Sequence, residues 1–210
     1  MIIASILAAF GIEAGWDARG ERMRRDALMD DLRTELVRNR DDLSTTLVAQ
    51  RLREERINLL LGELTSPPAG LAANSVRALQ VSLIGLSSYD PSLGILELLI
   101  QSGDLALIED RELRARLAGL SSVSEDYLAN QYLLVQTFFT PEWILGTGSI
   151  FLDMSDIVEG DTLLTTASPS VRTTSARFLA IDRMMTELMI GQGEELRNEV
   201  EALIKMIQRR

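Results

Sequence analysis

Residues 17–64 read "DARGERMRRDALMDDLRTELVRNRDDLSTTLVAQRLREERINLLLGEL", without a proline. Apolar residues recur there at spacings near three and four, with charged residues between them, which is typical of an amphipathic helix. The recurring apolar positions are Met23, Leu28, Leu32, Leu36, Leu43, Leu47, Ile57, Leu61 and Leu64. The pattern predicts one long helix over residues 17–64, ended by Pro67 and Pro68 because proline lacks an amide donor.

The C-terminal part of the chain carries a second long helical pattern. Ser168 is suited to the N-cap and Pro169 to the first turn, so we expect a helix over residues 170–208. Its apolar positions are Phe178, Ile181, Met185, Leu188, Met189, Leu196, Val200, Leu203 and Ile207. Gly191 and Gly193 are weak points in this helix. Two long amphipathic helices bury their apolar faces most simply by packing antiparallel.

Shorter helices are expected between the two long ones. Their predicted ranges are residues 71–87, 91–102 and 110–139, followed by an irregular stretch over 146–169. Gly103, after Ser102, predicts a helix end in the left-handed conformation, and Glu109-Asp110 predicts a new helix start. No useful alternation of apolar and polar residues indicates a strand. The sequence therefore predicts an all-α fold with a single helical domain over 17–210.

Composition and charge narrow the classes of function. The 210 residues include neither cysteine nor histidine, so thiolate chemistry is excluded and the commonest metal ligand and general base are missing. The net charge is −10, and residues 89–170 alone hold 3 Arg against 13 Asp and Glu. This balance is opposite to that of a nucleic-acid-binding surface. We therefore expect a protein that is not an enzyme, binds no nucleic acid and holds no cofactor or metal.

The first residues have a different character. "MIIASILAAFGI" (1–12) is apolar on every side, and Trp16 follows where the apolar run gives way to arginine. The arginines concerned are Arg19, Arg22, Arg24 and Arg25. Tryptophan beside basic residues is the order found at a bilayer interface. Twelve residues form only about 18 Å of helix, short of a full span, so we interpret 1–16 as a truncated or marginal membrane anchor; the alternative is the start of a core helix.

Two blocks of the sequence resemble a family of uncharacterised bacterial proteins with one N-terminal membrane helix. The first is "FGIEAGWDARGERMRRD", with Trp16, Asp17 and Arg19 at matching positions. The second is "YDPSLGILELLIQSGDLALIEDRELRARLAGL", which matches at Ser102, Gly103, Leu105, Leu107, Ile108, Asp110, Leu113 and Arg114. The resemblance implies a membrane-anchored helical domain, here at a bacterial inner membrane with a single pass, and it implies no known activity. It leaves the side of the membrane open.

Only weak signals point to a binding site. The richest aromatic cluster, which could line a pocket, consists of Tyr127, Tyr132, Phe138, Phe139 and Trp143. The acidic stretch "DMSDIVEGD" (153–161) lacks the spacing of a calcium-binding loop. "GTGSIF" (146–151) and "GQGEEL" (191–196) lack the third glycine and the preceding strand of a nucleotide-binding turn.

Three hypotheses follow. The first is a non-enzymatic, membrane-anchored helical protein that contacts lipid through its N-terminal helix. The second is a helical sensory or small-ligand-binding domain built around the aromatic cluster. The third is a soluble coiled-coil partner protein that forms homo-oligomers through its long amphipathic helices.

Overall fold

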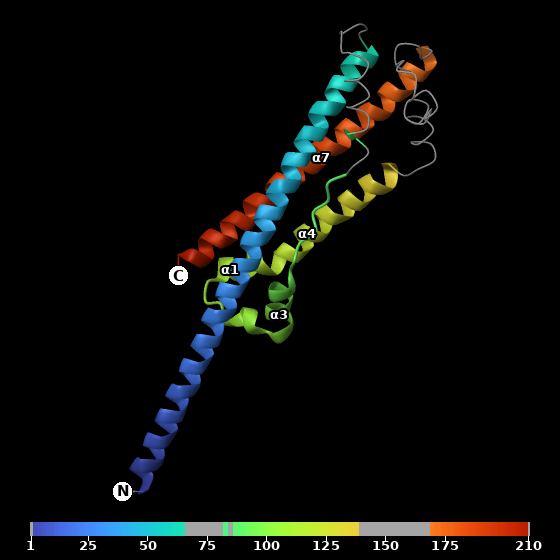
Figure 1. Cartoon of the computed structure of the whole chain (residues 1–210). Coiled ribbons are helices and arrows are strands. Elements are labelled where there is room, and N and C mark those ends of the chain that lie inside the picture. Colours follow the sequence, from blue (N-terminus) through green and yellow to red (C-terminus); the bar gives the residue numbers. More distant parts are fainter. Residues whose placement is uncertain (1, 66–81, 84–85, 139–168, 210) are drawn as a thin grey trace. The chain divides into compact units, whose positions relative to one another are not determined.

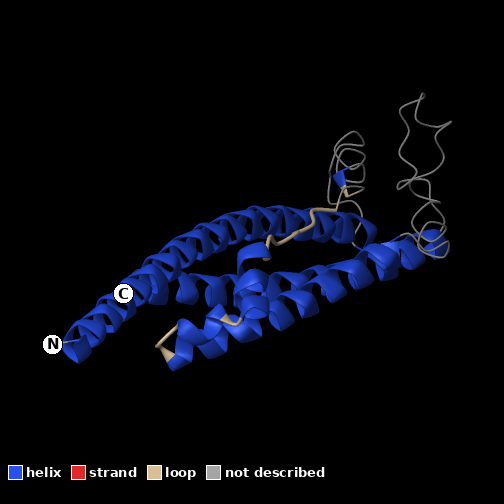
Figure 2. Ribbon diagram, turned by 90° about the horizontal axis from the view of Figure 1, so that it is seen from below, coloured by secondary structure: helices blue, strands red, loops and turns tan. Residues whose placement is uncertain are grey.

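The computed structural model describes the backbone of residues 2–65, 82–83, 86–138 and 169–209. Within these ranges, side chains are described except for residues 2–15, 17–18, 21, 138 and 169–172. The elements are α1 (Ile2–Thr65), α3 (Gly94–Ser102), a 3-10 helix η1 (Asp104–Leu107), α4 (Arg111–Phe138) and α7 (Pro169–Gln208) (Figure 1). No strand occurs in these ranges, and the described chain consists of helices and loops (Figure 2). The all-α prediction is confirmed.

The contacts divide the chain into two compact units. Unit 1 comprises Met1–Asp41, Pro91–Ser122 and Asn198–Arg210, and unit 2 comprises Asp42–Asp90 and Val123–Arg197. Each of α1, α4 and α7 therefore contributes a segment to both units. The backbone of α1 is helical from Ile2 onward, so no helix break marks the predicted domain boundary at residue 16.

In unit 1 the start of α3 is fixed by side chains of α1. Leu93, at the N-cap position of α3, makes no side-chain capping bond. Instead both carboxylate oxygens of Glu35 accept backbone N–H groups, from Ile95 at 2.8 Å and Leu96 at 3.2 Å. One turn further along α1, the amide of Asn39 donates to the carbonyl of Ser92 (2.7 Å) and accepts its N–H (3.0 Å). These bonds supply the partners that a helix N-terminus otherwise lacks.

The connector between α3 and α4 confirms the predicted helix end at Gly103 and the predicted helix start at Glu109-Asp110. Gly103 ends α3 with φ of 78°, a conformation that glycine adopts without strain. A carboxylate oxygen of Asp110 accepts the N–H groups of Glu112 (2.9 Å) and Leu113 (3.1 Å) and so caps α4. Arg114 donates to the carbonyl of Ile108 at 2.8 Å. Many residues of the second resembling block thus have structural roles in this turn.

In unit 2, α1 and α7 run antiparallel, as the sequence predicts. Arg51 of α1 pairs with Glu194 of α7, whereas Arg53, further along α1, pairs with Asp182, which lies earlier in α7. The numbering therefore rises along one helix as it falls along the other. An apolar cluster consisting of Ile57, Leu60, Leu64, Leu83 and Leu179 continues the contact.

The helix boundaries differ from the predicted ones in places. Residues 86–90 have no regular secondary structure, so the helix predicted over 71–87 does not include its last two residues, and 71–81 lie outside the described residues. The helix predicted over 91–102 begins only at Gly94, because Glu35 fixes the N–H groups of the following residues. Most of the predicted irregular stretch 146–169 also lies outside the description, and its last residue, Pro169, begins α7.

Two nearby glycines of α7 should respond oppositely to alanine. A Cβ at Gly193 would lie 2.7 Å from a methyl carbon of Leu47 and 3.2 Å from the ring of Tyr127, both of them buried, whereas a Cβ at Gly191 meets nothing within 4 Å. Alanine gains about 1 kcal/mol of helix propensity at either site, but overpacking costs roughly 1–3 kcal/mol. We expect Gly191→Ala to raise the free energy of unfolding by up to about 1 kcal/mol and Gly193→Ala to lower it, as urea denaturation would measure. Equal effects would contradict this close packing.

Candidate functional site

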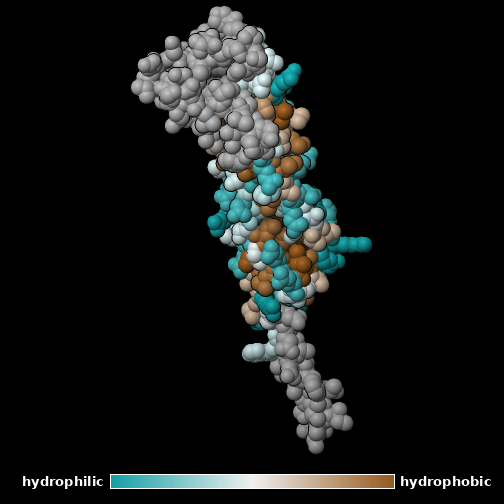
Figure 3. All heavy atoms as spheres, turned by 90° about the vertical axis from the view of Figure 1, so that its right-hand side faces the viewer, coloured by the Kyte–Doolittle hydropathy of each residue, from teal (hydrophilic) through white to brown (hydrophobic). Residues whose placement is uncertain are grey.

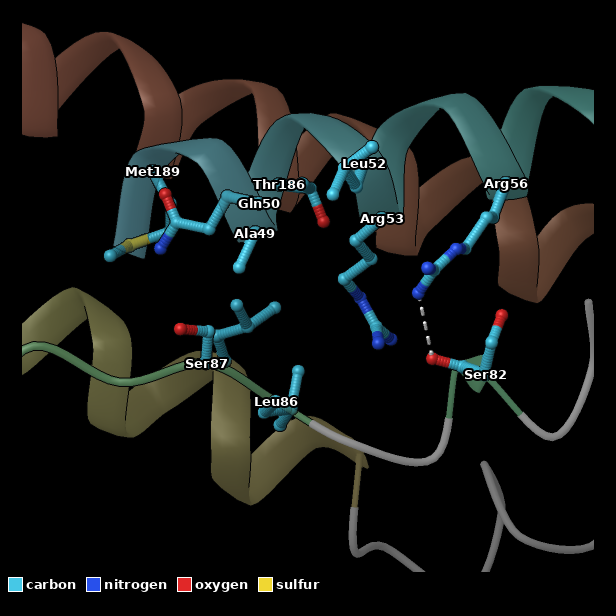
Figure 4. Close-up of a pocket in the computed structure, with 11 residues that line it drawn as sticks. Ala49, Gln50, Leu52, Arg53, Arg56, Ser82, Leu86, Ser87, Thr186 and Met189 are labelled. Atoms are coloured by element: carbon cyan, nitrogen blue, oxygen red, sulfur yellow. Dashed lines mark hydrogen bonds between the residues drawn. The ribbon is translucent and has the colours of Figure 1, made fainter. Parts of the chain in front are cut away.

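Unit 2 contains a cleft of about 220 Å³ between segments of α1 and α7 and the residues around Ser82 (Figure 4). Its lining residues are Ala49, Gln50, Leu52, Arg53, Arg56, Ser82, Leu86, Ser87, Leu134, Thr186 and Met189. The volume is below the roughly 300–1,000 Å³ of pockets for drug-sized ligands. The cleft therefore fits only a small molecule.

A buried ion pair lies at the side of this cleft. The guanidinium of Arg53 donates to both carboxylate oxygens of Asp182, at 3.3 and 2.8 Å, and to the carbonyl of Leu83 at 2.6 Å. The hydroxyl of Thr186 donates to the same carboxylate at 3.2 Å. Burial raises the pKa of Asp182, and Arg53 and Thr186 oppose that rise. The pair is satisfied internally, which suits a structural role that fixes the register of α1 against α7.

Next to the ion pair, Gln50 has one atom without a partner. Its amide nitrogen donates to the hydroxyl of Tyr127 at 3.1 Å, while its amide oxygen is buried and accepts no hydrogen bond from any described residue. Because a buried acceptor without a partner is costly, this atom is suited to a donor group of a ligand in the cleft. Arg56, also lining the cleft, lies 3.5 Å from the carbonyl of Ser82 (Figure 4) and adds positive charge.

Two tyrosines pack behind Gln50. The rings of Tyr89 and Tyr127 meet edge to face with centroids 5.9 Å apart. Burial is the main cause that raises the pKa of both phenols, and Asp42 adds to the rise at Tyr89. The backbone of Tyr89 is held by Gln131, which accepts its N–H (2.8 Å) and donates to its carbonyl (3.1 Å). The hydroxyl that accepts the hydrogen bond of Gln50 thus belongs to a packed pair of buried tyrosines.

The aromatic cluster predicted as a pocket is only partly described. Tyr127 is buried, whereas Tyr132 is 64% exposed, because five residues along a helix turn the side chain to another face. Neither residue lines the cleft. The side chain of Phe138, together with Phe139 and Trp143, lies outside the described residues, as does the acidic stretch 153–161.

The predicted interface residues lie on α1. Trp16 is 77% exposed, and Arg19, Arg22 and Arg24 are also exposed. Arg24 and the half-buried Arg25 form surface ion pairs with Asp104 (3.1 Å) and Glu109 (3.4 Å) of the α3–α4 connector. Within the part of the chain that the structure describes, no helix is sufficiently long and apolar to cross a membrane.

The site residues predicted from the sequence did not include Arg53, Asp182 or Gln50. The available signal was a charged residue on an otherwise apolar helix face. Arg53 lies four residues before Ile57 and Asp182 lies three residues after Leu179, so each shares a face with an apolar residue. A charged residue at a buried helical position requires a partner. Two such residues on helices predicted to pack antiparallel could have been paired.

The comparisons with known proteins do not identify a function. The sequence matches no family model and no curated protein, and the structure matches no solved structure. Among the described residues, no cluster of three or more carboxylates is placed to hold a metal ion. The described residues bring together an unpartnered amide oxygen and a guanidinium in a small cleft, and they place an exposed tryptophan beside arginines.

Proposed function

We propose that this chain is a non-enzymatic helical protein held at a bacterial inner membrane by its N-terminal residues. The observation that carries the proposal is Trp16, a large side chain that is 77% exposed on α1. It lies between an apolar run at 1–12 and the exposed arginines that follow. An exposed indole is costly in water but favourable at lipid headgroups, where its ring meets hydrocarbon and its N–H meets water.

Vesicle binding tests this proposal with Trp16 as the reporter. The chain holds two tryptophans, so Trp143→Phe leaves Trp16 as the single tryptophan, whose fluorescence can be excited selectively over that of the tyrosines. We expect its emission to shift to the blue and to be quenched by brominated acyl chains when vesicles of phosphatidylethanolamine and phosphatidylglycerol are added. Trp16→Phe, which keeps Trp143, is the matched control and should show neither change. Full retention of the aqueous spectrum with vesicles present would refute membrane attachment.

Charge reversal separates insertion from electrostatic attraction. Arg22→Glu combined with Arg24→Glu should weaken binding to phosphatidylglycerol vesicles roughly tenfold or more, at about 1 kcal/mol per basic residue. Inserted chain should resist a high-salt wash, because apolar contact is not screened. Release of all bound protein by salt would show attraction without insertion and would overturn the anchor.

A second candidate function is the binding of a small polar ligand in the cleft of unit 2. The specific observation is the unpartnered amide oxygen of Gln50, with Arg56 on the same cleft. These groups suit a small carboxylate that also carries a hydroxyl or amino donor. L-Lactate and L-serine are suitable probes, and a saturable rise in melting temperature that Gln50→Met removes would support this role. No rise at millimolar probe would exclude both compounds.

A further inference from the structure

A row of exposed residues runs along α7 on the side away from the core of unit 2. Ile181, Met184 and Leu188 are 44, 61 and 54% exposed, although each is a large apolar side chain. We define the outer stripe as the exposed residues Arg177, Ile181, Met184, Leu188, Gly191 and Glu195. Apolar and polar groups lie side by side on the surface of the described residues (Figure 3). The outer stripe differs from scattered surface residues in that its members are regularly spaced along one helix.

The spacing of the outer stripe is that of a coiled-coil seam. Successive members are separated by four, three, four, three and four residues. A repeat of this kind keeps one narrow face of a helix in contact with a partner helix. A helix face that contacts only water does not require it. The buried face of α7, with Asp182, Thr186 and Met189, is occupied inside unit 2. The outer stripe is therefore a second helix-packing face, and it is turned outward.

The stripe is complementary to itself when reversed. Arg177 and Glu195 lie nine residues either side of Thr186, Ile181 and Gly191 lie five either side, and Met184 and Leu188 lie two either side. A two-fold axis at the level of Thr186 would therefore place the two residues of each pair opposite one another in two antiparallel copies of α7. Such an interface is self-complementary, as a two-fold dimer requires.

The three facing pairs are chemically matched. Arg177 would meet Glu195 of the other copy, and Met184 would meet Leu188. Ile181 would meet Gly191, where no atom lies within 4 Å of the missing Cβ, so a large side chain has room. A parallel arrangement would instead place Arg177 against Arg177 and Glu195 against Glu195, which is unfavourable. We propose that two copies of this chain associate through the outer stripe of α7 as an antiparallel helix pair.

Charge reversal tests the proposal on the full chain. Light scattering and sedimentation should show a mass that rises with concentration toward that of a dimer. Arg177→Glu and Glu195→Arg should each raise the dissociation constant about tenfold. Each change puts like charges at positions 177 and 195, and these two positions face each other at two places in the dimer. The double variant with both changes should restore the original value. Arg111→Glu, an exposed reversal on α4, is the matched control and should change it less than about twofold.

Cross-linking tests the direction of the pair. The chain has no cysteine, so Met184→Cys and Leu188→Cys each introduce a single thiol. A mixture of the two variants should form disulfide-linked dimers faster than either variant alone, because position 184 faces position 188. A mass that stays monomeric, reversals that leave the dissociation constant unchanged, or faster linking within each variant alone would overturn the proposal. These readouts do not depend on vesicle binding.

Discussion

Replacing Asp182 with alanine is expected to lower the free energy of unfolding by about 3–5 kcal/mol. The change leaves the guanidinium of Arg53 buried, with its carboxylate partner removed, in a region where both side chains are nearly inaccessible (7 and 1% exposed). An uncompensated buried charge is costly because the interior cannot replace its hydration. Urea denaturation followed by circular dichroism measures the loss.

An exposed ion pair between the same two helices provides the matched control. Arg51 and Glu194 also join α1 to α7 within unit 2, but their side chains are 44 and 40% exposed. Glu194→Ala should therefore cost less than about 1 kcal/mol. The double variant Arg53→Met with Asp182→Leu should recover most of the loss, since it removes both charges together. Similar losses for Asp182→Ala and Glu194→Ala would contradict the assignment of the buried pair.

The fold was predictable where one local pattern decides the structure. The three-and-four spacing over 17–64 predicts a helix because each apolar residue returns to the same face, and Leu32, Leu36 and Leu47 are indeed fully buried. Gly103 predicts a helix end because glycine alone adopts the left-handed conformation at little cost, and its φ is 78°. These features depend on neighbours in sequence.

The polarity of Arg53 and Asp182 on apolar helix faces was visible in the sequence, but their exact pairing was not predictable, because it depends on the register between distant segments. Arg53 and Asp182 are 129 residues apart in the sequence, and they meet only because of the register in which α1 packs against α7. Leu188 and Met189 are both apolar and adjacent, so spacing alone could not decide which faces the core. The structure buries Met189 and leaves Leu188 54% exposed, and that assignment reveals the outer stripe.

Glu35→Ala is expected to cost about 2–4 kcal/mol, because it removes both acceptors from the start of α3 at once. The side chain is buried, and its two oxygens accept the N–H groups of Ile95 and Leu96. Those groups have no partner within their own helix, and the charge also lies at the positive end of the helix dipole. Urea denaturation measures the cost, and faster amide hydrogen exchange at Ile95 and Leu96 locates it.

Glu97 separates direct hydrogen bonding from the dipole effect alone. It is an exposed carboxylate in the first turn of the same helix, so Glu97→Ala loses only a dipole contribution of about 0.3–1 kcal/mol. Glu35→Gln keeps one acceptor oxygen and should cost roughly half as much as Glu35→Ala. If Glu35→Ala and Glu97→Ala lower the free energy of unfolding by the same amount, the interaction of a carboxylate with the helix dipole would explain both losses. In that case α3 would not depend on α1 for its cap. A cost several times larger for Glu35 means that α3 begins where α1 supplies the partners, rather than where its own sequence would begin it.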